Sequence, residues 1–321
     1  MPRRLVLMAA LLAVCAAGYM LWSAKAPWSF LLPYRATKLA ALLLVGVALS
    51  VATVLFQTVT ANRILTPSLM GFDALYVFVL TLLVHMLGAT GYAAIPPGLL
   101  FAANLGAMAG LGLLLFAGLM RLAGGDMIRL VLSGIVLGLL IRSMTEFLQR
   151  LIDPSEFQTV QSMSFARFTQ IDPLLLALSA TAILAALAAA WSLRTRLDVL
   201  SLGDTAATGL GEPPARLRRQ ALVVICILVA AATALVGPLS SGGFGPSSFF
   251  GLIVTAFAHI VTPTHRHAVL IPSAALVGGL VLVGGQFIME RLFALATPLT
   301  VVIELIGGAV FLVLLLKRRA A

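Results

Sequence analysis

Charged side chains inside long apolar segments are the residues of this sequence most suited to do chemistry. Arg142 and Glu146 lie in the apolar stretch 127–148, and Glu304 lies near the start of the stretch 301–316. Inserting an ionisable group into a bilayer costs on the order of 2.5–3.5 kcal/mol, so such groups are functional candidates by default. Arg142 and Glu146 are four residues apart and share one helix face. Two interpretations stay open: a structural ion pair, or the lining of a pathway for a charged substrate.

A stripe of small and polar residues marks the apolar stretch 39–56 and its end. Gly46, Ser50, Thr53 and Gln57 recur at spacings of four, three and four, which places them on one helix face. Small residues let helices approach closely, so the stripe predicts a packing seam. A polar wall of a translocation pathway is the alternative, and it makes Gln57 a candidate pathway-lining residue.

The motifs of common catalytic and metal sites are absent from the sequence. None of the three lysines follows a glycine, so there is no phosphate-binding loop for ATP. Cys15 and Cys226 lie inside apolar runs without metal-ligand spacing. His259, His265 and His267 cluster in sequence, and we expect them in a solvated loop rather than around a metal. We predict no catalytic residue, no metal site and no cofactor in this chain.

The elements that must position these residues are membrane-spanning helices. The 321 residues are 61% apolar and only 10% charged, whereas soluble domains carry about 25% charged residues. This composition excludes a soluble enzyme and a disordered chain. About 20 apolar residues cross a bilayer as a helix, which satisfies its own backbone there. Ten stretches are expected to be helices: 5–22, 39–56, 69–87, 95–119, 127–148, 174–191, 221–236, 249–261, 269–288 and 301–316.

The basic residues predict the orientation of the chain. With the N-terminus and ten spans placed from the cytoplasm, fourteen of the 21 Lys and Arg residues fall on the cytoplasmic side and six on the outer side. This bias is typical of cytoplasmic loops, so both termini are expected to be cytoplasmic. The membrane therefore explains the net charge of +10, and no nucleic-acid partner is implied. The segment 194–220 carries five arginines and is expected to be a cytoplasmic loop with room for short helices that meet a partner.

Three segments share motifs with a known family of transport proteins. They are Thr60–Gly71, in which Arg63 stands where the family has proline; Leu200–Gly211 with the basic run that follows; and Gly237–Pro238 with Phe250–Val254. These segments resemble the FecCD-type permeases of ABC importers for iron–siderophore complexes and vitamin B12. A narrower likeness, to the subgroup for ferric catechol-type siderophores, rests on 149–157, 284–286, Glu290, Arg291 and 303–308.

The resemblance implies a fold, a function and partners. Residues 1–321 would form a single transmembrane permease domain, an all-α polytopic membrane protein of the bacterial inner membrane. It would move a ferric siderophore of catechol type. The implied partners are two ATPase subunits that bind ATP and Mg, a second permease (a paralogue or another copy of this chain), a periplasmic siderophore-binding protein and membrane lipid.

The resemblance also implies roles for single residues. The 194–220 loop would couple to the ATPase through Leu202, Gly203, Asp204, Ala207, Leu210 and Gly211. Basic residues that receive acidic groups of the binding protein match Arg35, Lys38 and Arg291, with snorkelling at the membrane interface as the alternative. Spans five and ten line the substrate pathway in the family. The resemblance therefore implies that Arg142, Glu146 and Glu304 are pathway-lining candidates, as Gln57 is.

One departure from the family and several rival functions stay open. Residues 241–248 interrupt the motif between Gly237–Pro238 and Phe250–Val254, and the sequence leaves open whether transport tolerates this insertion. A proton-coupled secondary transporter working through Glu146 or Glu304 would need no ATPase. Within the ABC class, vitamin B12, haem or a metal ion are alternative cargoes, and the sequence does not identify a particular siderophore.

Overall fold

The structure is a computed structural model that describes residues 2–22, 27–124, 126–169, 171–239, 249–292, 299–305 and 308–309. Every regular element in these ranges is a helix, as predicted. The helices are α1 (Pro2–Leu21), α2 (Trp28–Val59), the short 3-10 helix η1 (Ser68–Met70), α3 (Phe72–Ala93), α4 (Pro97–Ala123), α5 (Met127–Gln149), α6 (Pro154–Met163), α7 (Pro173–Ser192), α8 (Arg194–Leu200), α9 (Asp204–Gly209), α10 (Pro214–Val236), α11 (Phe249–Val261) and α12 (His267–Leu292).

Eight of the described helices are long and apolar enough to cross a membrane: α1, α2, α3, α4, α5, α7, α10 and α12. Each coincides with a predicted stretch. The predicted stretch 249–261 is α11, whose 13 residues make it shorter than a full span. The stretch 301–316 lies mostly outside the described residues, although 299–305 are helical. The all-α polytopic prediction is therefore confirmed, with ten as an approximate count of spans.

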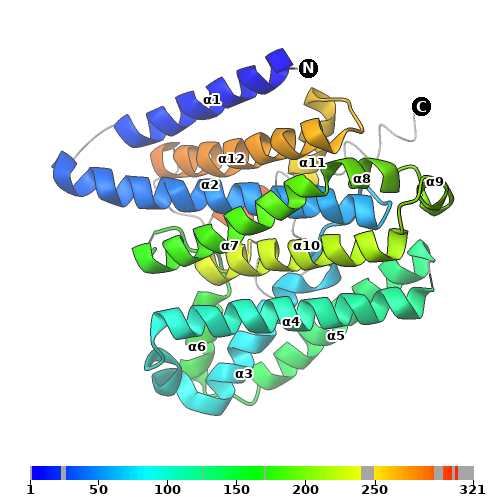
Figure 1. The fold of residues 1–321 in the computed structure, drawn as a ribbon. Coiled ribbons are helices and arrows are strands. Elements are labelled where there is room, and N and C mark those ends of the chain that lie inside the picture. The colour runs from blue at the N-terminus through cyan, green and yellow to red at the C-terminus, as the bar shows by residue number, and fades with distance from the viewer. Residues whose placement is uncertain are drawn as a thin grey trace.

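Two helices form the centre of the bundle. In α2 and α10, 67% of the most apolar window is buried, compared with 11% in α1. Helix α12 packs between α1 and α2, and α10 packs against α2, α4 and α7 (Figure 1). Helices α3, α4 and α5 form a second group on the other side of α10, while α8 and α9 lie together at one end of the bundle (Figure 1). We call this the α8–α9 end.

The polar stripe on α2 is a packing seam. A Cβ atom added to Gly278 of α12 would lie 2.5 Å from the carbonyl oxygen of Gly46 and 1.9 Å from Oγ of Ser50. One added to Gly251 of α11 would lie 2.4 Å from Oγ1 of Thr53. The small residues of the stripe therefore face glycines on α11 and α12, and the small side chains on both sides let these helix backbones approach closely.

A second close contact fixes α3 against α5. Gly71 precedes α3 with a φ of +98°, a left-handed conformation that favours glycine. A Cβ atom at Gly71 would lie 2.9 Å from Cα of Gly138 on α5. Gly71, the last residue of the motif Thr60–Gly71, therefore both forms the turn before α3 and contacts α5.

Candidate functional site

The charged residues predicted inside the membrane come together in one place. Arg142 on α5 lies within electrostatic range of Asp73, Glu146 and Glu304. Asp73 comes from the first turn of α3 and Glu304 from the helical residues 299–305, so three helices contribute. We call these four residues the Arg142 group. The carboxyl groups of Asp73, Glu146 and Glu304 offset the charge of the Arg142 guanidinium, which lowers the free-energy cost of placing this arginine in a membrane.

The backbone contact between α3 and α5 positions this group. Gly71 lies two residues before Asp73, and Gly138 lies one helical turn before Arg142. Their contact therefore sets the distance between the start of α3 and the part of α5 that carries Arg142. The proximity of Asp73 to Arg142 is a tertiary feature that no local sequence pattern indicates.

The 194–220 loop folds into the short helices α8 and α9, held by two bidentate ion pairs. Arg218 of α10 donates to both carboxylate oxygens of Asp204, with Nη1 2.8 Å from Oδ2. Arg196 donates to both oxygens of Glu212 at 2.6–3.1 Å. The guanidinium of Arg196 holds the pKa of the Glu212 carboxyl below its usual range, and the carboxylate raises the pKa of Arg196 in turn.

The predicted coupling residues of this loop divide into exposed and structural positions. Leu202 and Leu210 each expose 65% of their surface, an unusual exposure for apolar side chains that lie outside the membrane-spanning segments. Ala207, by contrast, is fully buried. Gly203 and Gly211 have φ values of +98° and +83°, so both provide turns. The loop thus presents two leucines on a braced scaffold.

Helix α8 is tied to two membrane-spanning helices by a chain of polar contacts. The backbone N–H of His267, at the start of α12, donates to Oδ1 of Asp198 at 2.7 Å, and Nδ1 of the same histidine lies 2.6 Å from that oxygen. Its Nε2 lies 2.7 Å from Oγ1 of Thr58 in the last turn of α2. A carboxylate at a helix N-terminus is favourable because the peptide dipoles point there. Movement of α8 must therefore act on both α2 and α12.

The expectation of a solvated loop is wrong for His267. That side chain is only 2% exposed, because it fills the space between α8, α2 and α12. His265 is exposed, and His259 is half-buried with Nδ1 2.8 Å from the carbonyl of Thr255. Among the described residues, no three His, Cys, Asp or Glu side chains are grouped closely enough to hold a metal.

A cavity of about 670 Å³ opens beside this contact, between the end of α2, the α8–α9 turn and the segment before α12. Gln57 lines it, and its amide donates to the carbonyl of Arg63 at 2.6 Å and to Oγ1 of Thr255 at 3.0 Å. Arg63 and Arg218 also line the cavity. Gln57 thus lies at the α8–α9 end, apart from the Arg142 group, and its pathway role stays a prediction.

The basic residues predicted to receive a binding protein are engaged inside the chain. Arg35 is 8% exposed, and its Nη1 donates to the backbone oxygens of Met20 and Trp22 at 2.7 and 3.1 Å. This satisfies carbonyl groups at the end of α1. Arg35 therefore joins α2 to α1, and in this conformation its guanidinium is not presented at the surface.

Lys38 is more deeply buried than Arg35. It is 4% exposed and forms an ion pair with Glu290 of α12, which also accepts hydrogen bonds from Gln286 at 2.9 Å and Tyr19 at 3.2 Å. The ion pair joins α2, α12 and α1 at the end opposite α8 and α9. The docking roles of Arg35 and Lys38 stay predictions. The side chain of Arg291 and the insertion 241–248 lie outside the described residues.

Comparison with known proteins identifies the family. A profile of the FecCD transport family matches residues 5–317. The chain belongs to the FecCD transport family. The resemblance drawn from the sequence motifs is therefore confirmed, and with it the prediction of a non-catalytic permease subunit of an ABC importer, in which a separate partner is the ATPase. A membrane location and ATPase and binding-protein partners follow for the family in general.

Named relatives cover nearly the whole FecCD chain. The petrobactin import system permease protein YclO of Bacillus subtilis is 37% identical over 306 residues, 95% of each chain. The petrobactin import system permease protein FatC of Bacillus anthracis is 30% identical, over 89% of this chain and 78% of that one. A metal-chelate type ABC transporter solved in an inward-facing conformation has the same fold, with a TM-score of 0.82 over 99% of this chain at 21% identity.

Proposed function

We propose that this chain is the permease subunit of a bacterial ABC importer that moves a ferric siderophore of catechol type across the inner membrane. The observation that carries the proposal is the 37% identity, over 95% of both chains, with a permease of a petrobactin import system. Petrobactin is a catechol-type siderophore, and the motifs around Glu290 and 303–308 independently resemble the catechol subgroup. No resident cofactor is required of this chain.

Energy would enter at the 194–220 loop. Two partner ATPase subunits bind ATP and Mg, and Leu202 and Leu210 offer exposed apolar side chains to a groove on one of them. Asp198 and His267 then link α8 to α12, while Thr58 extends the link to α2. Closure of the ATPase pair can shift the bundle between outward-open and inward-open states only if it binds one state better. A braced loop attached to α2 and α12 would transmit that preference to the bundle.

The substrate pathway would form between two permease subunits, the second being a paralogue or another copy of this chain. Helix α5 leaves Leu140, Met144 and Phe147 exposed beside the Arg142 group. A second permease packed on this apolar face would enclose Arg142 and Glu146 with the passing ferric complex. The periplasmic siderophore-binding protein would dock at the opposite end from α8 and α9. Because Arg35 and Lys38 are buried, docking on them requires that end to open.

Uptake of radiolabelled iron tests this proposal. Iron-starved cells that lack their own permease would express this chain with its ATPase and binding protein and receive iron as a catechol-type siderophore complex. The double variant Leu202→Ser/Leu210→Ser should lose uptake while still inserting in the membrane. The control is Leu122→Ser, which changes an exposed leucine at the end of α4, outside the 194–220 loop and the motifs shared with the family, and should retain uptake.

The alternatives give different outcomes in the same assay. Uptake that survives an inactive ATPase but stops with a protonophore would identify a proton-coupled secondary transporter. Uptake of haem, vitamin B12 or a metal ion in place of the siderophore would keep the ABC mechanism and replace the cargo. If uptake appears only after deletion of 241–248, the insertion disables transport.

A further inference from the structure

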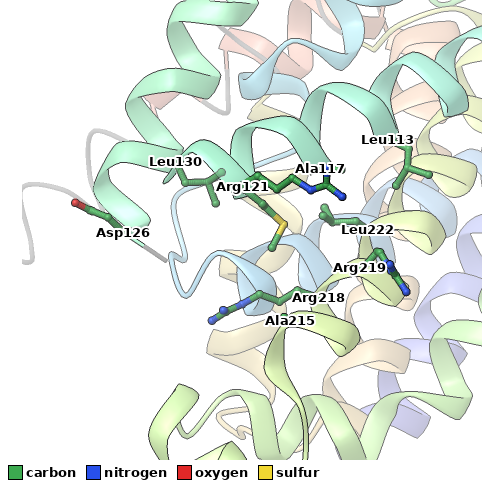
Figure 2. Close-up of a pocket in the computed structure, with 10 residues that line it drawn as sticks. Leu113, Ala117, Arg121, Asp126, Leu130, Ala215, Arg218, Arg219 and Leu222 are labelled. Carbon is green, nitrogen blue, oxygen red and sulfur yellow. The ribbon is translucent and has the colours of Figure 1, made fainter. Parts of the chain in front are cut away.

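An apolar pocket of about 360 Å³ lies between the end of α4, the start of α5 and the start of α10. It is at the α8–α9 end and shares Arg218 with the wall of the cavity that Gln57 lines. Its walls are aliphatic side chains from all three helices (Figure 2): Leu113, Ala117, Met120, Leu130 and Leu222. The pocket is too apolar for a soluble ion alone.

Two exposed arginines border this pocket. Arg121 from the last turn of α4 and Arg219 from the first turns of α10 are both exposed, and neither side chain forms a hydrogen bond or ion pair with another residue in the described ranges. Figure 2 shows the side chain of Arg121 extending along the pocket from α4, with Arg219 across from it on α10. The other charged lining residues are already paired: Arg218 within the 194–220 loop, and Asp126 with Arg129 at 3.2 Å.

The position of the pocket matches the boundary between hydrocarbon and headgroups. The spanning part of α4 ends at Leu122, and that of α10 begins at Pro214. Arg121 and Arg219 lie within two turns of these span ends, near the depth of the lipid phosphates, while Ala117 and Leu113 lie about one and two turns further along α4 toward the hydrocarbon. Basic pockets between spanning helices at this depth attract anionic headgroups.

We propose that this pocket binds one anionic phospholipid, with an acyl chain against the apolar walls and the phosphate between Arg121 and Arg219. The two guanidinium groups complement the single phosphate charge, and the aliphatic walls complement the chain. The lipid would lie beside the start of α10, next to Arg218, which also holds Asp204 of the 194–220 loop.

Lipid binding to the purified full-length chain in detergent tests the proposal. Native mass spectrometry would compare dioleoyl-phosphatidylglycerol with dioleoyl-phosphatidylcholine, and glycerol phosphate would serve as the headgroup alone. Phosphatidylglycerol should be preferred, and each arginine replaced should weaken its binding roughly fivefold. Arg121→Gln/Arg219→Gln should therefore lose most of the preference. The control Arg216→Gln/Arg266→Gln removes the same charge from exposed residues outside the pocket and should keep it.

A second variant tests the apolar part without changing any charge. Ala117→Phe fills the pocket and should also reduce binding of phosphatidylglycerol; size-exclusion chromatography confirms that each variant stays monodisperse. Equal binding of phosphatidylglycerol and phosphatidylcholine would overturn the proposal. So would an equal loss of phosphatidylglycerol binding in Arg121→Gln/Arg219→Gln and in the control Arg216→Gln/Arg266→Gln. Saturation by glycerol phosphate alone would make the site one for a soluble phosphate, and displacement of the lipid by the purified ATPase would make it a protein contact; either result also overturns the proposal.

Discussion

Gly71 is the residue whose replacement most directly tests how the Arg142 group is held. It joins the turn before α3 to the backbone of α5 at Gly138, one helical turn from Arg142. Gly71→Ala adds one methyl group, which should lower the stability of the chain in two ways. The positive φ disfavours alanine, and the methyl group crowds α5; the chain offers a control for each effect.

The magnitude follows from the local geometry. Alanine at a φ of +98° costs about 1–2 kcal/mol. Its Cβ would lie 2.9 Å from Cα of Gly138, whereas ordinary contacts begin at 3.4 Å, so α5 must retreat by about 0.5 Å. Overpacking against a backbone atom costs about 1–3 kcal/mol more. Gly71→Ala should therefore destabilise the chain by about 2–5 kcal/mol, which lowers the midpoint of thermal unfolding by roughly 4–10 °C at about 2 °C per kcal/mol.

The two controls separate these costs. Gly124 has a φ of +57° with nothing within 4 Å of its added Cβ, so Gly124→Ala should cost about 1 kcal/mol, the conformational part alone. In Gly138→Ala the added Cβ would lie 3.3 Å from Cα of Gly71, a milder form of the same contact. Alanine has a higher helix propensity than glycine, which offsets this contact, so the net change in stability should be near zero. Thermal unfolding of the full-length chain in one detergent measures all three. If Gly71→Ala is no worse than Gly124→Ala, the contact with α5 contributes nothing and the reasoning is refuted.

Three further predictions concern the polar contacts. Asp198→Ala should destabilise the chain by about 1–3 kcal/mol, and Asp198→Asn, which keeps an acceptor for the N-terminus of α12, should recover part of this; equal unfolding midpoints would contradict the link. Because Arg196 holds the pKa of Glu212 low, the stabilisation by this carboxylate is present above the unfolded pKa near 4.5 and is lost as the pH falls through the lower folded value. The midpoint difference between wild type and Glu212→Gln should therefore shrink on acidification, and a difference independent of pH would refute the assignment. Lys38→Met should cost about 3–5 kcal/mol by leaving the half-buried carboxylate of Glu290 without its cation, and Lys38→Met/Glu290→Leu should recover most of it; a double variant no more stable than the single one would contradict this pairing.

Much of the fold could be predicted because the membrane imposes it on composition. The apolar stretch 249–261 has the bounds of α11, and the other predicted spans in the described ranges each contain a helix. The helical face shared by Gly46 and Ser50 was also predictable from spacing. The packing seam was predicted from α2 as well, but its partners Gly278 and Gly251 were not, because they belong to other helices.

The candidate site was predictable in its parts but not in its assembly. The motif around the 194–220 loop indicated the exposed positions Leu202 and Leu210, since the family resemblance carried them over residue by residue. The partners of Arg35 and Lys38 were not predictable: a basic residue near a span end has the same local sequence whether it faces solvent or a buried glutamate. Lys38 meets its partner 252 residues away.

The sequence by itself determined that this chain is a helical membrane protein of the FecCD family, because hydropathy and short motifs are local properties. Only the tertiary structure decided which side chains meet. Asp198 and His267 are 69 residues apart, and their contact exists because α8 folds back onto the start of α12. Asp73, Arg142 and Glu304 come together because α3, α5 and the helical residues 299–305 are neighbours. Such contacts depend on how helices pack, and packing is set by complementary surfaces on different segments rather than by any one of them.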